Sequence, residues 1–407
     1  MSVLLLGTMN SMAQQTMTLD DCLALALTQS RQMQRSDLSV REAKANQGTA
    51  WEMDKMEVTL SQDPTSGGSP DNAVSVGQTF SFPTLYAARR RELKAETELA
   101  RRQQEVTRRE VMAQVSGIYY DLALALGSLH VYERQDSVYE VFERLAETKY
   151  KNGETSRLEV INAHQTRSEN RMLMQGLRQQ YETLQQQLAD AIGGEERVIV
   201  EPVENHHLAI PDFGLDQDAA TYDYANTPQG RVMEQEVEVN RRQLSVARNE
   251  LAPDITLAAR TQCVISGFNP YDELRQRYEG GNFMGFEVGM ALPLFFGSQR
   301  AKVKSQRLAL ERTALDLEQA QAEARTDYRD AISECRRTAS ALSYYEKEGH
   351  EDAEELARLS QLSYEQGEIG YVEYIQNQKA ALELHLNHLK AINDYQHALV
   401  RYAKVKE

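Results

Sequence analysis

The eight histidines of this 407-residue chain are the side chains best suited to exchange a proton at neutral pH, and they can also bind a metal ion. His385 and His388 are three positions apart, which places both imidazoles on one face of a helix, a spacing that can hold a metal ion. No third ligand is evident near them in the sequence, so a solvated helix face is the preferred interpretation. His206 and His207 lie in an irregular stretch. We therefore predict neither a metal site nor a cofactor.

Patterns that support catalysis are also missing from the sequence. It contains no phosphate-binding loop, no nucleophile elbow and no Ser/His/Asp arrangement. Cys22, Cys263 and Cys335 are too few and too scattered for a disulfide framework or a metal knuckle. The net charge of −16 gives no reason to expect a nucleic acid as partner. The prediction is a protein that is not an enzyme.

Two similar stretches, residues 150–162 and 364–376, repeat tyrosine and acidic residues at the same places. Both have Tyr first, then Gly-Glu, a second Glu and an Ile, and the offset is 364 − 150 = 214. A glycine that closes one helix just before another begins indicates the tip of a helical hairpin. The sequence therefore predicts two tandem copies of a unit with one tip each.

The elements that would position these tips can be read from the hydrophobic periodicity. Each copy is predicted to contain a helix, a β-hairpin, a long helix, the tip and a return helix. The predicted ranges are 1–13 for the end of a secretory signal, 14–192 for the first copy (β-hairpin 55–82, long helix 85–149, tip 150–159), 193–228 for a linker, and 229–407 for the second copy (β-hairpin 254–292, long helix 298–366, tip 364–373).

The long helices carry apolar residues at a spacing close to 3.5, which favours packing against partner helices. The first of them would be a rod of about 100 Å. Residues 18–51 form a further helical pattern that Thr18 can cap. Val198 to Val200 could form a short strand.

The predicted strands alternate apolar with small or polar side chains over about ten residues, as membrane-spanning β-strands do. Val74, Val76 and Phe80 share one face of the second strand, and Phe286, Val288 and Met290 share one face of the fourth. We expect the aromatic residues near the ends of these strands to contribute to an interfacial girdle: Phe80, Phe82, Tyr86, Phe283, Phe286, Phe295 and Phe296. Four strands cannot close a barrel, and an open edge cannot face lipid. The membrane interpretation thus requires oligomerisation, and three copies, with 12 strands, are the smallest assembly expected to conduct.

With this duplicated order the chain resembles the outer membrane efflux protein (TolC) family. The motif from Tyr364 through Gly367 to Ile375, its weaker partner around Gly153, and Ala225 to Pro228 carry the resemblance. It implies a homotrimer with a 12-stranded β-barrel in outer-membrane lipid, continued by a periplasmic α-helical barrel. Such a duct passively conducts substrate from an inner-membrane pump through a periplasmic adaptor (membrane fusion) protein. The second tip most resembles the branch paired with heavy-metal resistance-nodulation-division pumps.

The resemblance also implies roles for individual residues. Periplasmic gate residues fall on Tyr150, Arg157, Glu159, Tyr364 and Glu373, with Glu159 and Tyr364 bonding the two hairpins and Glu373 forming an inward acidic ring. Ile369 stands where the family often has a basic partner, and Arg157 could substitute for it. Adaptor-contact tips fall on Gly153, Glu154, Gly367 and Glu368.

Two alternatives stay open at this point. The chain could be a soluble, elongated coiled-coil structural or adaptor protein whose strands are ordinary hairpins. Tyr150, Glu159 and Tyr364 could also do no more than pack helices at a turn.

Overall fold

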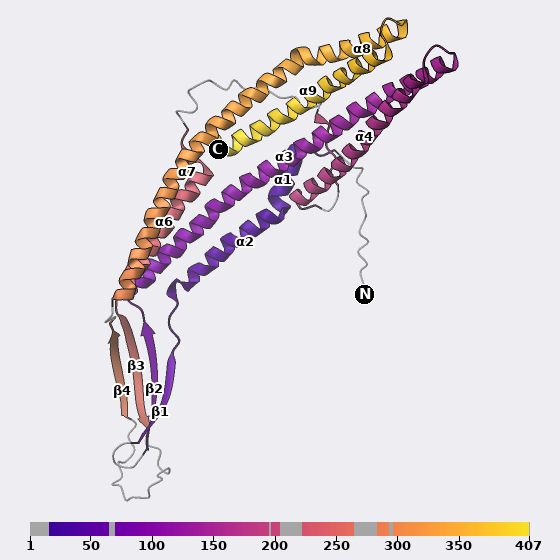
Figure 1. Ribbon diagram of the computed structural model, residues 1–407. Helices are drawn as coiled ribbons and strands as arrows, with labels where there is room; N and C mark the ends of the chain where they lie inside the picture. Colours follow the sequence, from indigo (N-terminus) through magenta and orange to yellow (C-terminus); the bar gives the residue numbers. More distant parts are fainter. Residues whose placement is uncertain are drawn as a thin grey trace, which may run out of the picture. The chain divides into compact units, whose positions relative to one another are not determined.

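The computed structural model in Figure 1 describes residues 16–64, 70–194, 197–203, 222–263, 283–292 and 296–406. This part of the chain is mainly helical with one small β-sheet, as the sequence predicts. The expected signal end at 1–13, the pair His206 and His207, and Phe295 lie outside the described residues.

The order of elements matches the predicted order in each half of the chain. The elements are α1 (Leu19–Gln29), α2 (Arg31–Asn46), η1 (Gln47–Trp51), β1 (Glu57–Pro64), β2 (Pro70–Phe80), α3 (Pro83–Lys151), α4 (Arg157–Ile192), η3 (Tyr224–Asn226), α6 (Pro228–Asn249), β3 (Asp254–Cys263), β4 (Phe283–Ala291), α7 (Gly297–Tyr344), the π-helical turn η4 (Tyr345–Gly349), α8 (His350–Gln366) and α9 (Tyr371–Lys406). Helices α3 and α4 form a first hairpin, and α8 and α9 form a second (Figure 1). None of the helices in the described ranges is long and apolar enough to cross a membrane.

The chain packs into two compact units, and each takes segments from both predicted copies. The first unit comprises residues 1–36, 104–228 and 322–407 and contains both helical hairpins. The second comprises residues 37–103 and 229–321 and contains the sheet. The division into two sequence copies stays a prediction from the repeat.

The sheet of the second unit is antiparallel, with strand order β1-β2-β3-β4. Its register aligns Val58 with Val76, Val76 with Ala259, and Ala259 with Phe286 across the four strands. On this face Phe286 is 81% exposed. Large apolar side chains dominate the face and are exposed to the surroundings of the chain: Val58, Leu60, Val76, Leu257, Met284, Phe286, Val288 and Met290.

The opposite face of the sheet is polar or small. Thr59 pairs with Ser75, Ser75 with Arg260, and Arg260 with Gly285, while Glu287 lies two residues further along β4. The predicted alternation is therefore confirmed. Within the described residues, the outer edges of β1 and β4 have no partner strand.

The core of the first unit forms where α1, α3, α4 and α9 pack together, around fully buried residues such as Leu122, Leu188 and Tyr395. Thr18 caps α1 as predicted, because its hydroxyl accepts a hydrogen bond from the Asp21 amide at 3.3 Å. Val198 and Val200 are buried in this core without forming a strand.

The structure differs from the sequence predictions at three further places. The helical pattern over 18–51 is broken at Ser30 and ends in the 3-10 turn η1. The long helix expected over 298–366 is interrupted by the π-helical turn η4. Tyr86 is buried rather than part of an exposed girdle, because its ring stacks on Trp51 at 5.5 Å and its hydroxyl accepts the Ser81 amide.

Candidate functional site

The two helical hairpins of the first unit are joined near their tips by a hydrogen bond between Tyr364 and Glu159. The Tyr364 hydroxyl of α8 donates to Glu159 Oε1 of α4 at 2.6 Å. Glu159 also accepts a hydrogen bond from the Thr155 hydroxyl, which orients the carboxylate in the first turn of α4. A hydrogen bond to an ionised carboxylate contributes about 1.5–3 kcal/mol, more than a neutral one.

Around this bond lies an aromatic cluster that sequence reasoning missed. Phe142 of α3 lies 5.3 Å from the Tyr364 ring, 5.1 Å from the Tyr371 ring and 5.2 Å from the Tyr374 ring, measured between centroids. Together with Glu159 these residues are called the inter-hairpin cluster below. Ring pairs at such distances add about 0.5–1.5 kcal/mol each beyond their area burial. The hairpins are thus held by apolar contact as much as by the hydrogen bond.

Burial and hydrogen bonding keep the Tyr364 phenol protonated. The Tyr364 side chain is buried, and this burial raises its pKa, as does the hydrogen bond to the Glu159 carboxylate. The Lys149 ammonium lies 4.4 Å above the centre of the same ring, a cation–π contact from the last turn of α3. Burial, with the neighbouring Tyr139, also raises the pKa of Tyr374, to about 12. At neutral pH Tyr364 therefore acts as a hydrogen-bond donor, and Tyr374 packs as a neutral ring.

Of the five predicted gate residues, the structure brings only Glu159 and Tyr364 into contact. Tyr150 is 45% exposed at the end of α3, and Arg157 and Glu373 are exposed in the first turns of α4 and α9. Ile369, in the position where a basic residue was expected, packs against the inter-hairpin cluster instead. An apolar contact therefore stands in the place of the ion pair for which Arg157 was considered.

The predicted adaptor-contact residues lie at the two turns. Gly153 and Gly367 have φ angles of 75° and 76°, the left-handed conformation that ends a helix before a sharp turn. Glu154 and Glu368 follow them and are exposed. The turns therefore present glycine backbone and carboxylates to the surroundings, and their contact with an adaptor stays a prediction.

The missed members of the cluster had only a weak signal in the sequence. Tyr371 and Tyr374 flank Glu373 inside the repeated stretch, whereas Phe142 is one of many apolar residues along a long helix. Only the pairing of the two hairpins shows that Phe142 meets three tyrosines.

A second polar contact joins α3 to α9 in the same unit. His397 Nε2 donates to Asp121 Oδ1 at 2.9 Å, and Asn393 Nδ2 donates to the same oxygen at 3.3 Å. The hydrogen bond to Asp121 raises the pKa of His397. Burial alone would raise the pKa of Asp121, but the hydrogen bonds from His397 and Asn393 lower it. Proton uptake by His397 therefore strengthens this contact.

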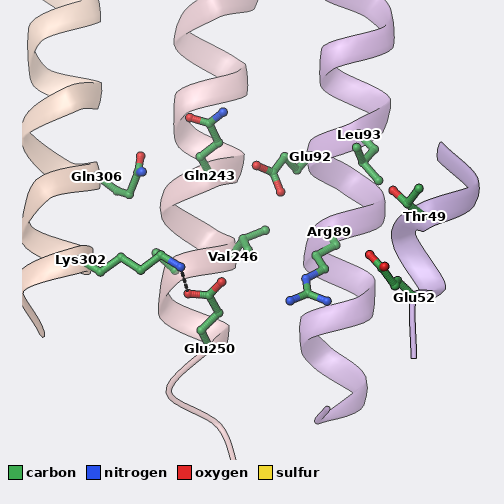
Figure 2. Close-up of a pocket in the computed structure, with 11 residues that line it drawn as sticks. Thr49, Glu52, Arg89, Glu92, Leu93, Gln243, Val246, Glu250, Lys302 and Gln306 are labelled. Carbon is green, nitrogen blue, oxygen red and sulfur yellow. Dashed lines mark hydrogen bonds and ion pairs between the residues drawn. The ribbon is translucent and has the colours of Figure 1, made fainter. Parts of the chain in front are cut away.

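The second unit contains a polar cavity of about 480 Å³ beside the sheet-proximal ends of α3, α6 and α7 (Figure 2). Lys302 of α7 forms an ion pair with Glu250, which follows α6. Burial, followed by repulsion from Glu96, raises the pKa of Glu92. The lining residues are Thr49, Glu52, Arg89, Glu92, Leu93, Gln243, Val246, Ala247, Glu250, Lys302 and Gln306. The cavity thus offers charges of both signs but no nucleophile paired with a base.

The histidines His385 and His388 lie on one face of α9, as their spacing predicts, and are half-buried. His350 of α8 joins them, with its ring centroid 5.5 Å from each of the other two. Among the residues that the structure describes, no group of three histidine, cysteine or carboxylate side chains is placed to hold a metal ion.

Comparison with known proteins relates the second half of the chain to a family. Residues 224–405 match the family model described as outer membrane efflux protein. The match covers 182 of the 407 residues, slightly less than half of the chain. A search of the curated proteins finds no match to the sequence.

Solved structures with the same fold include several channels of bacterial outer membranes. The Campylobacter jejuni CmeC outer membrane channel has a TM-score of 0.78 and 13% identity, covering 95% of this chain and 85% of its own. The Vibrio cholerae outer membrane protein VceC has a TM-score of 0.74 and 14% identity, covering 95% of both chains. The open state of the Neisseria gonorrhoeae MtrE outer membrane channel has a TM-score of 0.74 and 16% identity, covering 95% and 88%. At these identities the likeness establishes the fold.

Proposed function

We propose that the chain is an outer membrane efflux protein, the exit duct of a tripartite efflux or secretion system. It passively conducts substrate from an inner-membrane pump to the outside of the cell. It resides in the outer membrane and extends into the periplasm. The observation that carries the proposal is the four-stranded sheet, whose exposed apolar face alternates residue by residue with a polar face. An apolar outer face and a polar inner face are what a barrel wall in lipid requires.

The unpaired outer edges of β1 and β4 lead to the assembly that we propose. Unpaired edge groups cost several kcal/mol each in lipid, so the edges must pair with other copies of the chain. An even number of antiparallel strands allows β4 of one copy to pair antiparallel with β1 of the next. Three copies give a 12-stranded barrel wide enough to conduct, which supports a homotrimer.

We further propose that the inter-hairpin cluster holds the periplasmic end closed, and that Tyr150, Arg157 and Glu373 line the same entrance. The exposed turns at Gly153, Glu154, Gly367 and Glu368 would contact a periplasmic adaptor. The preference for heavy-metal pumps stays a prediction.

The test compares two substitutions in adjacent residues of β4 that lie on opposite faces of the sheet. Phe286→Arg places a charge on the apolar face, at a cost of about 2–4 kcal/mol per chain if that position is near the middle of a bilayer. We expect this variant to lose trimer assembly in detergent and ion conductance in planar bilayers. The matched control, Glu287→Gln on the polar face, should assemble and conduct like the wild type.

The coiled-coil alternative makes the opposite prediction. A soluble structural protein would stay monomeric and dispersed without detergent, and both substitutions would leave it unchanged. That outcome would exclude the duct.

A further inference from the structure

Three histidines of the second hairpin form a compact group that the proposed duct does not use. His350 begins α8, and His385 and His388 lie one helical turn apart on α9. The ring centroid of His350 is 5.5 Å from those of His385 and His388. These three residues are called the histidine cluster. Three imidazoles so close can accept protons one at a time, and each added charge repels the others.

The histidine cluster lies beside the π-helical turn η4, where the long helix is interrupted. The Tyr345 ring of this turn lies nearly parallel to the His388 ring, 6.4 Å away. A Cβ atom at Gly349 would be 2.8 Å from Tyr345 Cδ1, so only glycine leaves room for this ring position. Single π-helical turns within α-helices are frequent at functional sites. The π-helical turn therefore places the Tyr345 ring beside the titratable His388 ring.

The charged groups that face the cluster do not neutralise it. Glu354 of α8 lies 3.6 Å from His350 and can balance one proton, but both side chains are about half or more exposed, so the pair is weak. Arg134 of α3 faces His385 and opposes its protonation. Burial, and after it the neighbouring His350, lowers the pKa of both His385 and His388. The packed hairpin therefore favours neutral imidazoles.

We propose that the histidine cluster is an acid-sensitive contact, in which proton uptake by more than one imidazole separates α8 from α9 beside η4 and loosens the tip. The tip glycine, Gly367, is 17 residues beyond His350, or about 25 Å along the helix. Repulsion at the base of the hairpin therefore acts on the helix that carries Tyr364. The link to conduction rests on the proposed duct, whereas the separation of the helices does not.

The sign of the pH effect follows from the lowered pKa values of His385 and His388. Above pH about 6.5, the ordinary pKa of histidine, His385 and His388 are neutral in both states of the hairpin and the contact is intact. As the pH falls below that value, the separated helices bind more protons than the packed ones, so packing weakens. The contact should therefore be lost on acidification.

Amide hydrogen exchange of the full-length protein in detergent tests this proposal at pH 7.5 and pH 5, with rates corrected for the intrinsic effect of pH. In the wild type we expect protection of amides in η4, α8 and the facing part of α9 to fall about tenfold or more at pH 5. A triple variant, His350→Gln, His385→Gln and His388→Gln, should keep its protection within about twofold. The matched control is His164→Gln, an exposed histidine of the first hairpin, which should behave like the wild type.

A second variant tests the proposal even if the triple variant misfolds. His388→Lys introduces a fixed charge and should lower protection in these segments already at pH 7.5. Equal protection of the wild type at both pH values, or an equal loss in the triple variant, would overturn the proposal. Conductance recorded in parallel separates the two ideas. Acid-induced exchange in a channel whose conductance does not change supports the contact and counts against its link to gating, whereas a protein that never conducts counts against the duct.

Discussion

At the scale of single residues, the structure joins the two hairpins through one charge-assisted hydrogen bond set among aromatic rings. The resemblance to the TolC family implied that Tyr364 and Glu159 are partners, and the structure forms this bond. Its role in gating stays a prediction. The ring of Phe142 and the aliphatic side chain of Ile369 could not be assigned from sequence, because their roles depend on which helices pair.

Removing the hydrogen bond should weaken the contact between hairpins while leaving the rings packed. Tyr364→Phe deletes only the hydroxyl, and Glu159→Gln removes the charge. We expect each to cost about 1.5–3 kcal/mol in thermal or denaturant unfolding and to raise open probability in planar bilayers. The double variant should cost clearly less than the sum, which a double-mutant cycle measures. For unfolding stability, Tyr150→Phe, at the exposed tyrosine of the first tip, is the matched control. Additive effects would mean that the two residues act separately.

The Asp121–His397 contact should give unfolding stability a second pH dependence, opposite to that of the histidine cluster. The raised pKa of His397 means that its contribution is complete below pH about 6.5 and is lost as the pH rises through the higher folded value. The lowered pKa of Asp121 means that its contribution is present above pH about 3.8 and is lost below it.

His397→Gln should therefore destabilise the protein more at pH 6 than at pH 9, as unfolding temperatures at the two values would record. The Asp121→Asn variant should show the same reduced pH dependence. An equal loss at both pH values would contradict the charged contact.

At the scale of elements, the parts fixed by local periodicity were the predictable ones. The strands were evident because their residues alternate with period two, and the hairpin tips because glycine is repeated where the apolar pattern stops. The π-helical turn was not evident, because it depends on how Tyr345 packs over Gly349 and against His388 on another helix. The histidine cluster was missed for the same reason, since His350 lies 385 − 350 = 35 residues from His385.

Glycines at helix ends provide a test of how closely the elements pack. Gly153 and Gly193 both have positive φ, but a Cβ atom at Gly153 would meet nothing within 4 Å, whereas one at Gly193 would lie 2.4 Å from the Gln29 carbonyl oxygen. Gly153→Ala should cost about 1–2 kcal/mol, the strain of a left-handed conformation. Gly193→Ala adds a backbone clash between the ends of α4 and α1, so we expect a clearly larger loss of unfolding stability. If denaturant titrations showed the same loss of unfolding free energy for both variants, α1 would be free to move away from the added Cβ atom.

At the scale of the whole molecule, an open amphipathic sheet makes the chain incomplete by itself. The exposed apolar face needs lipid, and the edges of β1 and β4 need strands that the described part of the chain does not supply. The solved structures that share this fold include the CmeC and MtrE outer membrane channels. The number of copies follows from barrel size and can be tested directly.

Cysteine cross-linking between copies tests closure of the barrel through the β1 and β4 edges. Thr59→Cys on β1 and Glu287→Cys on β4 place thiols on the polar face of the two edge strands. In a Cys263→Ser background, flexible bifunctional reagents should convert the detergent-purified protein into covalent dimers and trimers and nothing larger. Ser75→Cys with Glu287→Cys is the matched control, because β2 is enclosed by β1 and β3 of its own chain and should give far fewer covalent oligomers. Cross-linking that stops at dimers would contradict the trimer, since two copies supply only eight strands, which side chains fill.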